Sequence, residues 1–536
     1  MKILEYIKEF FLNNCKKIIT AVMYFSCALV FISWATDFYM EEVAAKLLIF
    51  VTVVFYIFAG GFLRAAYLMF LGITVLFENH LVINYSYPFS RIGKEILVLA
   101  SETTSLEFST YLNLITQQEY LNFFYLLAVC IFVCRFSPRQ RSSAFPIFVG
   151  SLLLVTAMWN DLGAPVYAFR QEMSESAAIL SRYKAFEFQA QDVSEEEYST
   201  CILIIGETHR YDFLEKYGYS EKYSPNLLKA RDDGSMYVFS DAISGFYYTT
   251  ASVPVILTRK PIDYDNRFYE EKSLITAFKE AGYATYTLSY TKKTQPEDDA
   301  MNMVFLEADK YINHVDTSET FDDVGMLPFI QEILANKEVK KKLIVIKMIG
   351  AHYLYEDRYP KEYDIHQPSF KTVPDSGEAA NNPVLLKNSY KNAVIYSMNF
   401  VDQLAELIEK QEEPVLMTFV SDHGTVLFDD DKAKYIGRAK GAYHVGFFIT
   451  GNDSFWQKTA YEKKYNLGKH KDEPITQEYF FETYLSLAQI KYFEHRPKYD
   501  LTSDGFEPTV KRIVWTGSGI ENYDDLLPEK PIEEKK

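Results

Sequence analysis

Short polar patches in the last two-thirds of the chain hold the residue types of a single metal site. They lie at positions 206–208, 249–254, 350–352, 421–424 and 444. Most of them directly follow a strand-like apolar run, as Glu207 follows the run 201–205. Because ligands and catalytic groups gather at the carboxyl ends of strands in α/β folds, we expect these patches to meet in space.

Three of these side chains, Glu207, Asp422 and His423, could hold a divalent ion. Zinc suits a mixed set of carboxylate and imidazole ligands best, and manganese or magnesium suits it less well. A hydroxyl of the patch 249–254 could supply a fourth ligand and also act as a nucleophile, because a bound cation lowers the pKa of a threonine hydroxyl. The same cation would offset the charge of a phosphoryl group in transfer.

Two histidines stand at the ends of other apolar runs. His352 and His444 could bind substrate oxygens, act as acid or base, or hold a second metal ion. The residues alone leave these roles open, and they leave the number of zinc ions at one or two.

Composition narrows the class of protein. The chain has 536 residues, too many for one ordinary core, and its formal net charge of −17 argues against a nucleic-acid partner. Of the 5 cysteines, only Cys201 lies outside the apolar first third. The later part of the chain therefore cannot form an internal disulfide.

The first 160 residues hold almost all of the long uncharged runs. We expect a transmembrane bundle of five helices at about 18–36, 47–63, 65–77, 120–134 and 142–159. Basic residues in short loops mark the cytoplasmic side, and Lys16, Arg64 and the cluster 135–141 all fall on one side of such a bundle. The loop 78–119 and everything after 160 would then lie on the other side. Buried helices of a soluble protein are the alternative, which the one-sided charge disfavours.

The rest of the chain predicts an α/β domain with a mainly parallel sheet flanked by helices, because strand-like and helical runs alternate. The expected strands are 201–205, 283–290, 343–348, 415–420 and 445–450, and the clearest expected helices are 273–281 and 390–411. Residues 165–190 indicate an amphipathic helix on a membrane surface, or an ordinary linker helix. A loop at 362–388 and disorder from Asn522 are also expected.

These patterns divide the chain into four parts. The expected boundaries are 1–160 for the transmembrane domain, 161–199 for the bridging segment, 200–515 for the catalytic domain and 516–536 for a charged tail.

Taken together, the motifs resemble the phosphoethanolamine transferases, membrane enzymes of the alkaline phosphatase/sulfatase superfamily. The matching segments are 204–210, 218–219, 224–227, 249–254, 350–352, 421–424, 443–445 and the helix that begins near 390. Five spans followed by a periplasmic catalytic domain is also the layout of that family, so the resemblance covers most of the chain.

The resemblance implies a reaction and the residues that carry it. Phosphatidylethanolamine would give its headgroup to Thr249 and release diacylglycerol, and lipid A, the lipopolysaccharide core or a periplasmic glycan would then accept the phosphoethanolamine. The implied zinc ligands are Glu207, Thr249, Asp422 and His423, and the implied substrate-binding residues are His352, His444 and Glu107. The protein would be a multi-pass protein of the bacterial inner membrane with its catalytic domain in the periplasm, and we expect a monomer.

The chain departs from the best-known lipid A-modifying members of the family. They carry disulfides in the catalytic domain, including one around the nucleophile loop, and this chain can form none there. That difference weakens the assignment of lipid A as the acceptor. The active-site lysine of the family has no clear match in this chain; Lys292 and Lys293 are candidates for it.

Three other functions were weighed against this one. A sulfatase-type hydrolase would need an arginine two residues after Pro254, where the chain has Ile256. A glycerophosphate transferase of the lipoteichoic-acid-synthase type shares the architecture and the threonine, but it would prefer manganese and phosphatidylglycerol. An inactive membrane-anchored scaffold is disfavoured because every expected ligand type is present.

Overall fold

The computed structural model describes most of the second half of the chain and parts of the first. The described residues are 17–29, 42–85, 117–137, 147–152, 175–176, 178–264, 266, 268–289, 300–313, 323–373, 382–429, 434–435, 439–509, 511–516, 519–526 and 528. The chain forms two compact units, Met1–Gln171 and Glu172–Lys536. Each unit is described by itself.

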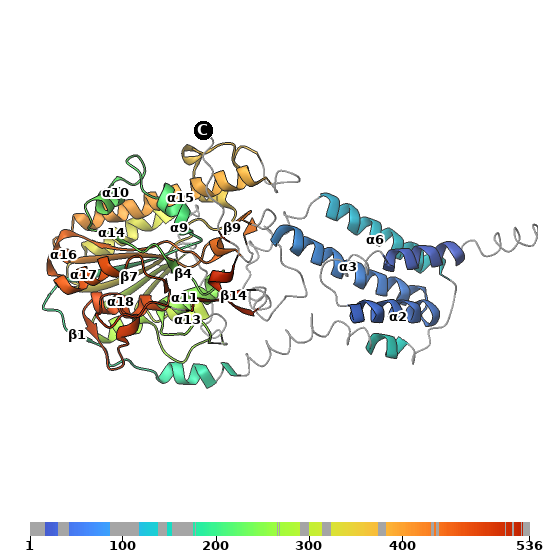
Figure 1. Ribbon diagram of the computed structural model, residues 1–536, viewed down its shortest axis with the longest axis horizontal. Coiled ribbons are helices and arrows are strands. Elements are labelled where there is room, and N and C mark those ends of the chain that lie inside the picture. Colours follow the sequence, from blue (N-terminus) through green and yellow to red (C-terminus); the bar gives the residue numbers. More distant parts are fainter. Residues whose placement is uncertain are drawn as a thin grey trace, which may run out of the picture. The chain divides into compact units, whose positions relative to one another are not determined.

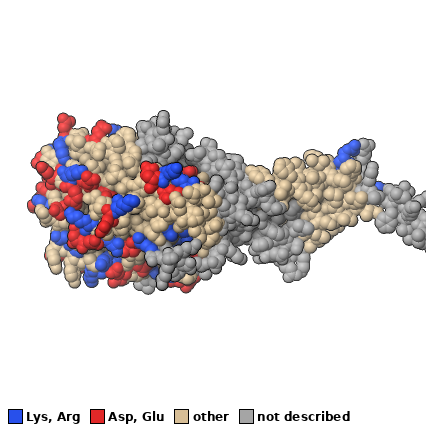
Figure 2. Space-filling model, turned by 90° about the horizontal axis from the view of Figure 1, so that it is seen from above, with Lys and Arg blue, Asp and Glu red and all other residues tan. Residues whose placement is uncertain are grey.

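The first unit is helical. Its helices include α2 (Glu42–Phe58), α3 (Gly61–Tyr85) and α6 (Gln117–Phe136), with further helical residues at 17–29 and 147–152. Leu68 of α3 and Val129 of α6 are buried in a common apolar cluster, and the described surface of this unit shows almost no charged side chains in Figure 2. None of the helices in the described ranges combines the length and the apolar character needed to cross a membrane. The expected five-span bundle is therefore not confirmed by these helices.

A seven-stranded sheet forms the centre of the second unit, in the order β3-β11-β8-β2-β7-β5-β6. Five neighbouring strands are parallel: β2 (Ser199–Gly206), β5 (Ala284–Ser289), β6 (Lys310–Asn313), β7 (Lys341–Lys347) and β8 (Val415–Ser421). Strand β11 (Phe447–Gly451) runs antiparallel between β8 and β3 (Tyr237–Val238), so β3 runs in the same direction as β8. Strands β2 and β8, which have the longest buried runs, are neighbours and run in the same direction. Their carboxyl ends therefore meet at one edge of the sheet.

Helices cover both faces of this sheet (Figure 1). Alternate residues of β2 point to opposite sides: Leu203 joins one apolar core and Ile204 joins the other. The first core is shared with α11 (Thr249–Leu257), α12 (Leu274–Glu280), α13 (Ala300–Phe305), α17 (Tyr461–His470) and α18 (Tyr479–Leu487). The second is shared with α9 (Tyr211–Tyr217), α10 (Pro225–Asp232), α14 (Leu327–Ala335) and α15 (Pro383–Glu409).

Shorter elements surround this three-layer body. They are the paired strands β1 (Gln191–Asp192) and β13 (Ile490–Lys491), β4 (Ala242–Ile243) and β12 (Ile475–Thr476), β9 (Val426–Leu427) and β10 (Lys434–Tyr435), β14 (Ile513–Thr516) and β15 (Gly519–Asn522), and helix α16 (Asp453–Lys458). Single 3-10 turns occur at η4 (Asp323–Met326), η5 (Tyr355–Arg358), η6 (Lys361–Tyr363), η8 (Lys440–Ala442), η9 (Pro497–Tyr499) and η10 (Tyr523–Asp525).

The predicted α/β architecture is confirmed, with two corrections at element ends. The expected loop 362–388 is too long, because α15 already begins at Pro383, where Asn382 caps it by accepting from the N–H of Val384. The expected disorder from Asn522 is wrong for its first residues, because β15 ends at Asn522 and η10 follows it. The hairpin of β14 and β15 contacts a loop that lies far earlier in the chain, at Gly245. Such a distant contact leaves no local signal in the sequence.

Residues 178–185 are helical and lead into the body of the second unit through 186–190, which are not helical. The helix predicted over 165–190 is thus shorter at its end, and its start lies outside the described residues. Tyr183 donates to Glu307 Oε1 at 2.5 Å, and the backbone N–H groups of Phe188 and Ala190 donate to Glu280 at 3.0 and 2.9 Å. These contacts hold the linker, residues 178–190, against the rest of the second unit.

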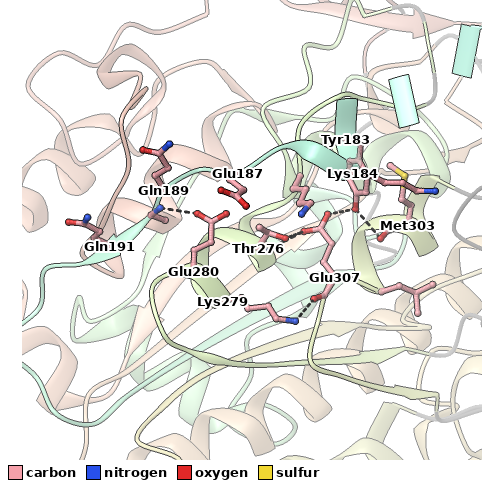
Figure 3. A pocket seen from close by; sticks show the side chains of 13 residues that line it. Tyr183, Lys184, Glu187, Gln189, Gln191, Thr276, Lys279, Glu280, Met303 and Glu307 are labelled. Atoms are coloured by element: carbon pink, nitrogen blue, oxygen red, sulfur yellow. Dashed lines mark hydrogen bonds between the residues drawn. The ribbon is translucent and has the colours of Figure 1, made fainter. Parts of the chain in front are cut away.

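A pocket of about 880 Å³ lies beneath this linker (Figure 3). A partly buried carboxylate of the pocket, that of Glu307, accepts from the hydroxyls of Ser273 and Thr276 at the start of α12 as well as from Tyr183. None of the predicted site residues lines it. The polar groups in the pocket therefore serve to fasten the linker and to cap a helix.

Candidate metal centre

The predicted metal ligands leave the ends of two neighbouring strands. Glu207 follows the last residue of β2, and Asp422 follows the last residue of β8, in a register that pairs Gly206 with Ser421. Both carboxylates are buried, at 4% and 0% exposure. Parallel pairing alone thus brings together two residues that are far apart in the sequence.

Glu207, Asp422 and His423 form a compact ligand set. One ligand atom from each lies within 4.8 Å of the other two. His423 Nε2 is 3.5 Å from Glu207 Oε1 and 3.8 Å from Asp422 Oδ2. The structure therefore joins the three residues that the sequence predicted as ligands.

The tautomer of His423 is fixed by its backbone. Its Nδ1 lies 2.7 Å from the carbonyl oxygen of Gly424, which can only accept, so Nδ1 carries the proton. Nε2 then presents its lone pair to the carboxylates. A second-shell bond of this kind is what orients a metal-binding histidine.

Asp422 has one satisfied and one unsatisfied oxygen. Its Oδ1 accepts from the backbone N–H of Thr208 at 3.0 Å and of His423 at 2.7 Å. Its Oδ2 is buried and accepts no hydrogen bond from the described residues, although Lys347 Nζ stands 3.2 Å away. A buried carboxylate oxygen held in place and left open fits a cation ligand, and with the imidazole of His423 the donor set fits zinc.

Thr249 brings a hydroxyl to this set. It is the first residue of α11, and its Oγ1 lies 3.1 Å from Glu207 Oε2 and 3.4 Å from His423 Nε2. The hydroxyl of the next residue, Thr250, is buried and has no hydrogen-bond partner among the described residues. Of the hydroxyls in the patch 249–254, the one that points at the ligand set is that of Thr249.

The backbone before Thr249 is held by the C-terminal hairpin of β14 and β15. The N–H of Trp515 donates to the carbonyl of Gly245 at 2.8 Å, and the hydroxyl of Tyr443 donates to the carbonyl of Trp515 at 2.9 Å. The indole N–H of Trp515 donates to Ile262 beyond the end of α11. The loop that leads to Thr249 is thus braced by the hairpin.

Lys347, which the sequence analysis did not single out, completes the centre. It is the last residue of β7, its side chain is 4% exposed, and its Nζ lies 2.6 Å from Glu207 Oε2. Burial raises the pKa of Glu207, but the ammonium charge of Lys347, the largest opposing cause, helps to hold that pKa well below its ordinary value. Burial, and then the charge of Glu207, raises the pKa of Asp422. The only sequence signal for Lys347 was its position at the end of a strand, and that strand pairs with β2, which leads to Glu207.

His352 stands at the edge of the ligand set. Its Nδ1 donates to the carbonyl of Tyr353 at 2.5 Å, which leaves Nε2 as the acceptor of the ring. The loop that carries it is tied to β2, because the N–H of Ala351 donates to the carbonyl of Glu207 at 3.0 Å. Asp323, also missed from the sequence, accepts from the N–H groups of Ile349 and Gly350 and fixes the start of the loop.

The side chain of His444 contacts a backbone carbonyl and a neighbouring aromatic ring. Its Nε2 lies 3.0 Å from the carbonyl of Ser240, to which it donates, and its ring packs at 4.8 Å against Tyr211. Among the described contacts, none joins His444 to Glu207, Asp422 or His423. Its predicted role in substrate binding stays a prediction.

His209, which lies two residues after Glu207, is a buried structural residue. Its Nε2 lies 2.6 Å from Ser397 Oγ, and its ring packs edge-on against Phe419. Burial lowers the pKa of His209 to about 3, so the ring is neutral. Three other predicted candidates, Glu107, Lys292 and Lys293, lie outside the described residues.

Comparison with known proteins gives a consistent picture. The sulfatase family model matches residues 199–490. Phosphoethanolamine transferase EptC of Escherichia coli (strain K12) is 24% identical over 390 residues, an alignment that covers 69% of this chain and 65% of that protein. The chain thus spans just under two-thirds of the length of this relative.

Two solved structures share the fold. The integral membrane protein lipooligosaccharide phosphoethanolamine transferase A (EptA) from Neisseria meningitidis aligns with a TM-score of 0.63 at 18% identity, over 90% of this chain and 98% of that one. The C-terminal periplasmic domain of EcEptC from Escherichia coli, in complex with Zn, aligns with a TM-score of 0.54 at 22% identity, over 64% of this chain and 97% of that one. The resemblance to phosphoethanolamine transferases that the motifs predicted is confirmed.

Proposed function

The chain belongs to the sulfatase family, and from that premise we propose that it transfers phosphoethanolamine from phosphatidylethanolamine to an acceptor in the cell envelope. The acceptor would be lipid A, the lipopolysaccharide core or a periplasmic glycan. The observation that carries the proposal is the position of the Thr249 hydroxyl, 3.1 Å from Glu207 and 3.4 Å from His423.

The residues suggest a two-step displacement. In the first step Thr249 Oγ1 forms a bond to the phosphorus of the donor, the bond from phosphorus to the diacylglycerol oxygen breaks, and diacylglycerol leaves with a proton. In the second step an acceptor oxygen attacks the same phosphorus, gives up its proton, and frees Thr249. A divalent ion held by Glu207, Asp422 and His423 would lower the pKa of the attacking hydroxyl and offset phosphoryl charge.

The chain's own groups would support the transferred phosphoryl group. Thr249 begins the nine-residue helix α11, whose first N–H groups have no partner inside the helix and favour negative charge nearby. His352 is held by the carbonyl of Tyr353 so that Nε2 is available to the substrate. We assign to His352 Nε2 the uptake of the proton from the attacking hydroxyl and its return to the leaving oxygen; while protonated, Nε2 can donate to a phosphoryl oxygen.

We further propose that this enzyme is anchored in the bacterial inner membrane by the five apolar runs before residue 160, with unit Glu172–Lys536 in the periplasm. The uncharged runs and the one-sided basic residues support this location. The likeness to an integral membrane transferase over 90% of the chain is consistent with it. We assign zinc as the cofactor and a monomer as the working form.

Intact mass measurement tests the covalent step. The full chain in detergent is incubated with zinc and phosphatidylethanolamine, and the wild type is compared with Thr249→Ala and with Thr250→Ala, which removes the neighbouring hydroxyl only. A phosphoethanolamine adduct on the wild type and on Thr250→Ala, absent from Thr249→Ala, is expected. An adduct that forms with phosphatidylglycerol instead would point to a glycerophosphate transferase, and diacylglycerol release without any adduct would point to a hydrolase.

A further inference from the structure

The ammonium group of Lys347 is directed at the ligand set and the adjoining backbone. Its Nζ donates to Glu207 Oε2 at 2.6 Å and to the carbonyl oxygen of Met348 at 3.3 Å. It also forms an ion pair with Asp422 Oδ2 at 3.2 Å. Lys347 is therefore placed to act on both carboxylates at once.

The position of Lys347 is that of a cation between two ligands. It contacts the Glu207 oxygen that also accepts from Thr249, and it stands beside the Asp422 oxygen that accepts no hydrogen bond among the described residues. A second divalent ion bridging these two carboxylates would need the same two oxygens. The buried ammonium, at 4% side-chain exposure, already occupies the space next to them.

The charges of the centre also favour a single divalent ion. Two carboxylates and one ammonium carry a net charge of −1, which a single divalent ion changes to +1, ready for an anionic phosphoryl group. Without the ammonium the ligand set would carry −2 and would attract cations more strongly. Buried charges interact strongly because water does not screen them, so one fixed charge at this distance changes cation affinity substantially.

We propose that Lys347 is a positioning residue that serves as a built-in second cation: it holds Glu207 and Asp422 in place and limits the centre to one divalent ion. The inference rests on the proposed zinc site and defines its stoichiometry. It predicts that this centre keeps its ligand geometry without metal, because the ammonium separates the two carboxylates. It also predicts a weaker hold on zinc than the same ligands would have without the lysine.

Native mass spectrometry and zinc titration of the full chain in detergent test the proposal. Lys347→Met removes the charge and keeps the length of the side chain. Lys342→Met is the matched control, because Lys342 is a buried lysine of the same strand whose charged neighbours are Glu413 and Lys337. Zinc affinity, zinc stoichiometry and the melting temperature of the metal-free protein are measured for the wild type and both variants.

The wild type and Lys342→Met are expected to bind one zinc ion per chain. Lys347→Met is expected to bind zinc at least about tenfold more tightly and to melt at a lower temperature without metal, since its two carboxylates then repel each other. Two equivalent zinc ions in the wild type, or unchanged affinity in Lys347→Met, would overturn the role of Lys347 and leave the proposed function standing. If none of the three proteins bound zinc, both proposals would fail.

Discussion

The backbone N–H of Thr208 donates a 3.0 Å hydrogen bond to Asp422 Oδ1, although the two residues are 214 positions apart in the sequence. The bond links the ends of β2 and β8 and leaves Asp422 Oδ2 pointing toward His423 and Lys347. One oxygen of Asp422 therefore builds the centre, and the other is available to a metal ion.

Asp422→Asn separates these two roles. The amide oxygen can still accept from Thr208, so we expect the variant to fold, but the loss of charge should abolish zinc binding and transfer. The melting temperature should rise with zinc in the wild type and in Thr249→Ala, which keeps three ligands, and should not rise in Asp422→Asn. A full zinc-induced rise in Asp422→Asn would remove Asp422 from the ligand set.

Arg210 is a buried residue that stabilises the loop after Glu207. Its guanidinium donates to Asp429 at 2.9 Å and to Asp212 at 2.8 Å, and Asp429 is as deeply buried as Arg210 itself, at 1% side-chain exposure. Arg210→Met should cost about 3–5 kcal/mol because it leaves a buried carboxylate without its partner. Arg231→Met, which breaks the half-exposed pair with Glu215, should cost less than about 1 kcal/mol. Thermal unfolding of the two variants side by side checks the difference.

Gly350 lies at φ +45°, where its backbone passes close to Glu207. A Cβ there would stand 2.9 Å from the carbonyl oxygen of Glu207 and 2.8 Å from Cε1 of His209. Gly350→Ala should therefore displace Glu207. We expect the free energy of unfolding to fall by about 1–3 kcal/mol and the zinc affinity to fall clearly. The control is Gly468→Ala inside α17, where the nearest atom is 3.6 Å away and no loss is expected. Zinc titration of both variants would show whether the effect is local.

His495 provides a pH-dependent contribution to stability. Its hydrogen bond to Asp500, at 3.2 Å, raises its pKa; burial and the charge of Lys463 oppose the rise, and the charges of Glu482 and Asp500 support it. A raised pKa in the folded state stabilises the protein fully below the unfolded pKa of about 6.5, and that stabilisation is lost as the pH rises through the folded pKa. His495→Gln should thus lower the melting temperature more in acid than in alkaline buffer. The free energy of unfolding should change by less than about 1 kcal/mol, because the side chain is over a third exposed.

His366 offers the opposite sign in the same experiment. Burial, and then the charge of Lys391, lowers its pKa. The folded protein therefore loses stability as the pH falls below the pKa of this histidine in the unfolded chain. Compared with the wild type, His366→Gln should be more stable in acid than in alkaline buffer. If both variants changed with pH in the same direction, these environments of His495 and His366 would be wrong.

The strands and the grouping of the candidate metal ligands could be predicted because their signals are local. The run 201–205 is wholly apolar and wholly buried, and the polar residue after it had to lie at the sheet edge. Lys347 could not be predicted in the same way, because a lysine after an apolar strand usually lies in solvent. Only the pairing of β7 with β2 places it against Glu207.

The contacts around Thr249 also could not be predicted from local sequence patterns. The brace at Gly245 depends on a pairing with Trp515, and η10 follows it in a segment whose acidic composition indicated disorder. The contact of His444 Nε2 with the carbonyl of Ser240 likewise has no signal in the residue spacing. Such contacts follow from tertiary packing, which residue spacing does not contain.

The position of Cys201 has a practical consequence. It is the only cysteine after residue 134, it lies in the middle of β2 at 1% exposure, and burial raises the pKa of its thiol. With this thiol unreactive, the braced loop at Thr249 should fold equally well in reducing and oxidising surroundings. A cysteine introduced on the exterior of this unit, for example at the exposed Tyr461, would be the one group there that a thiol-specific dye could reach.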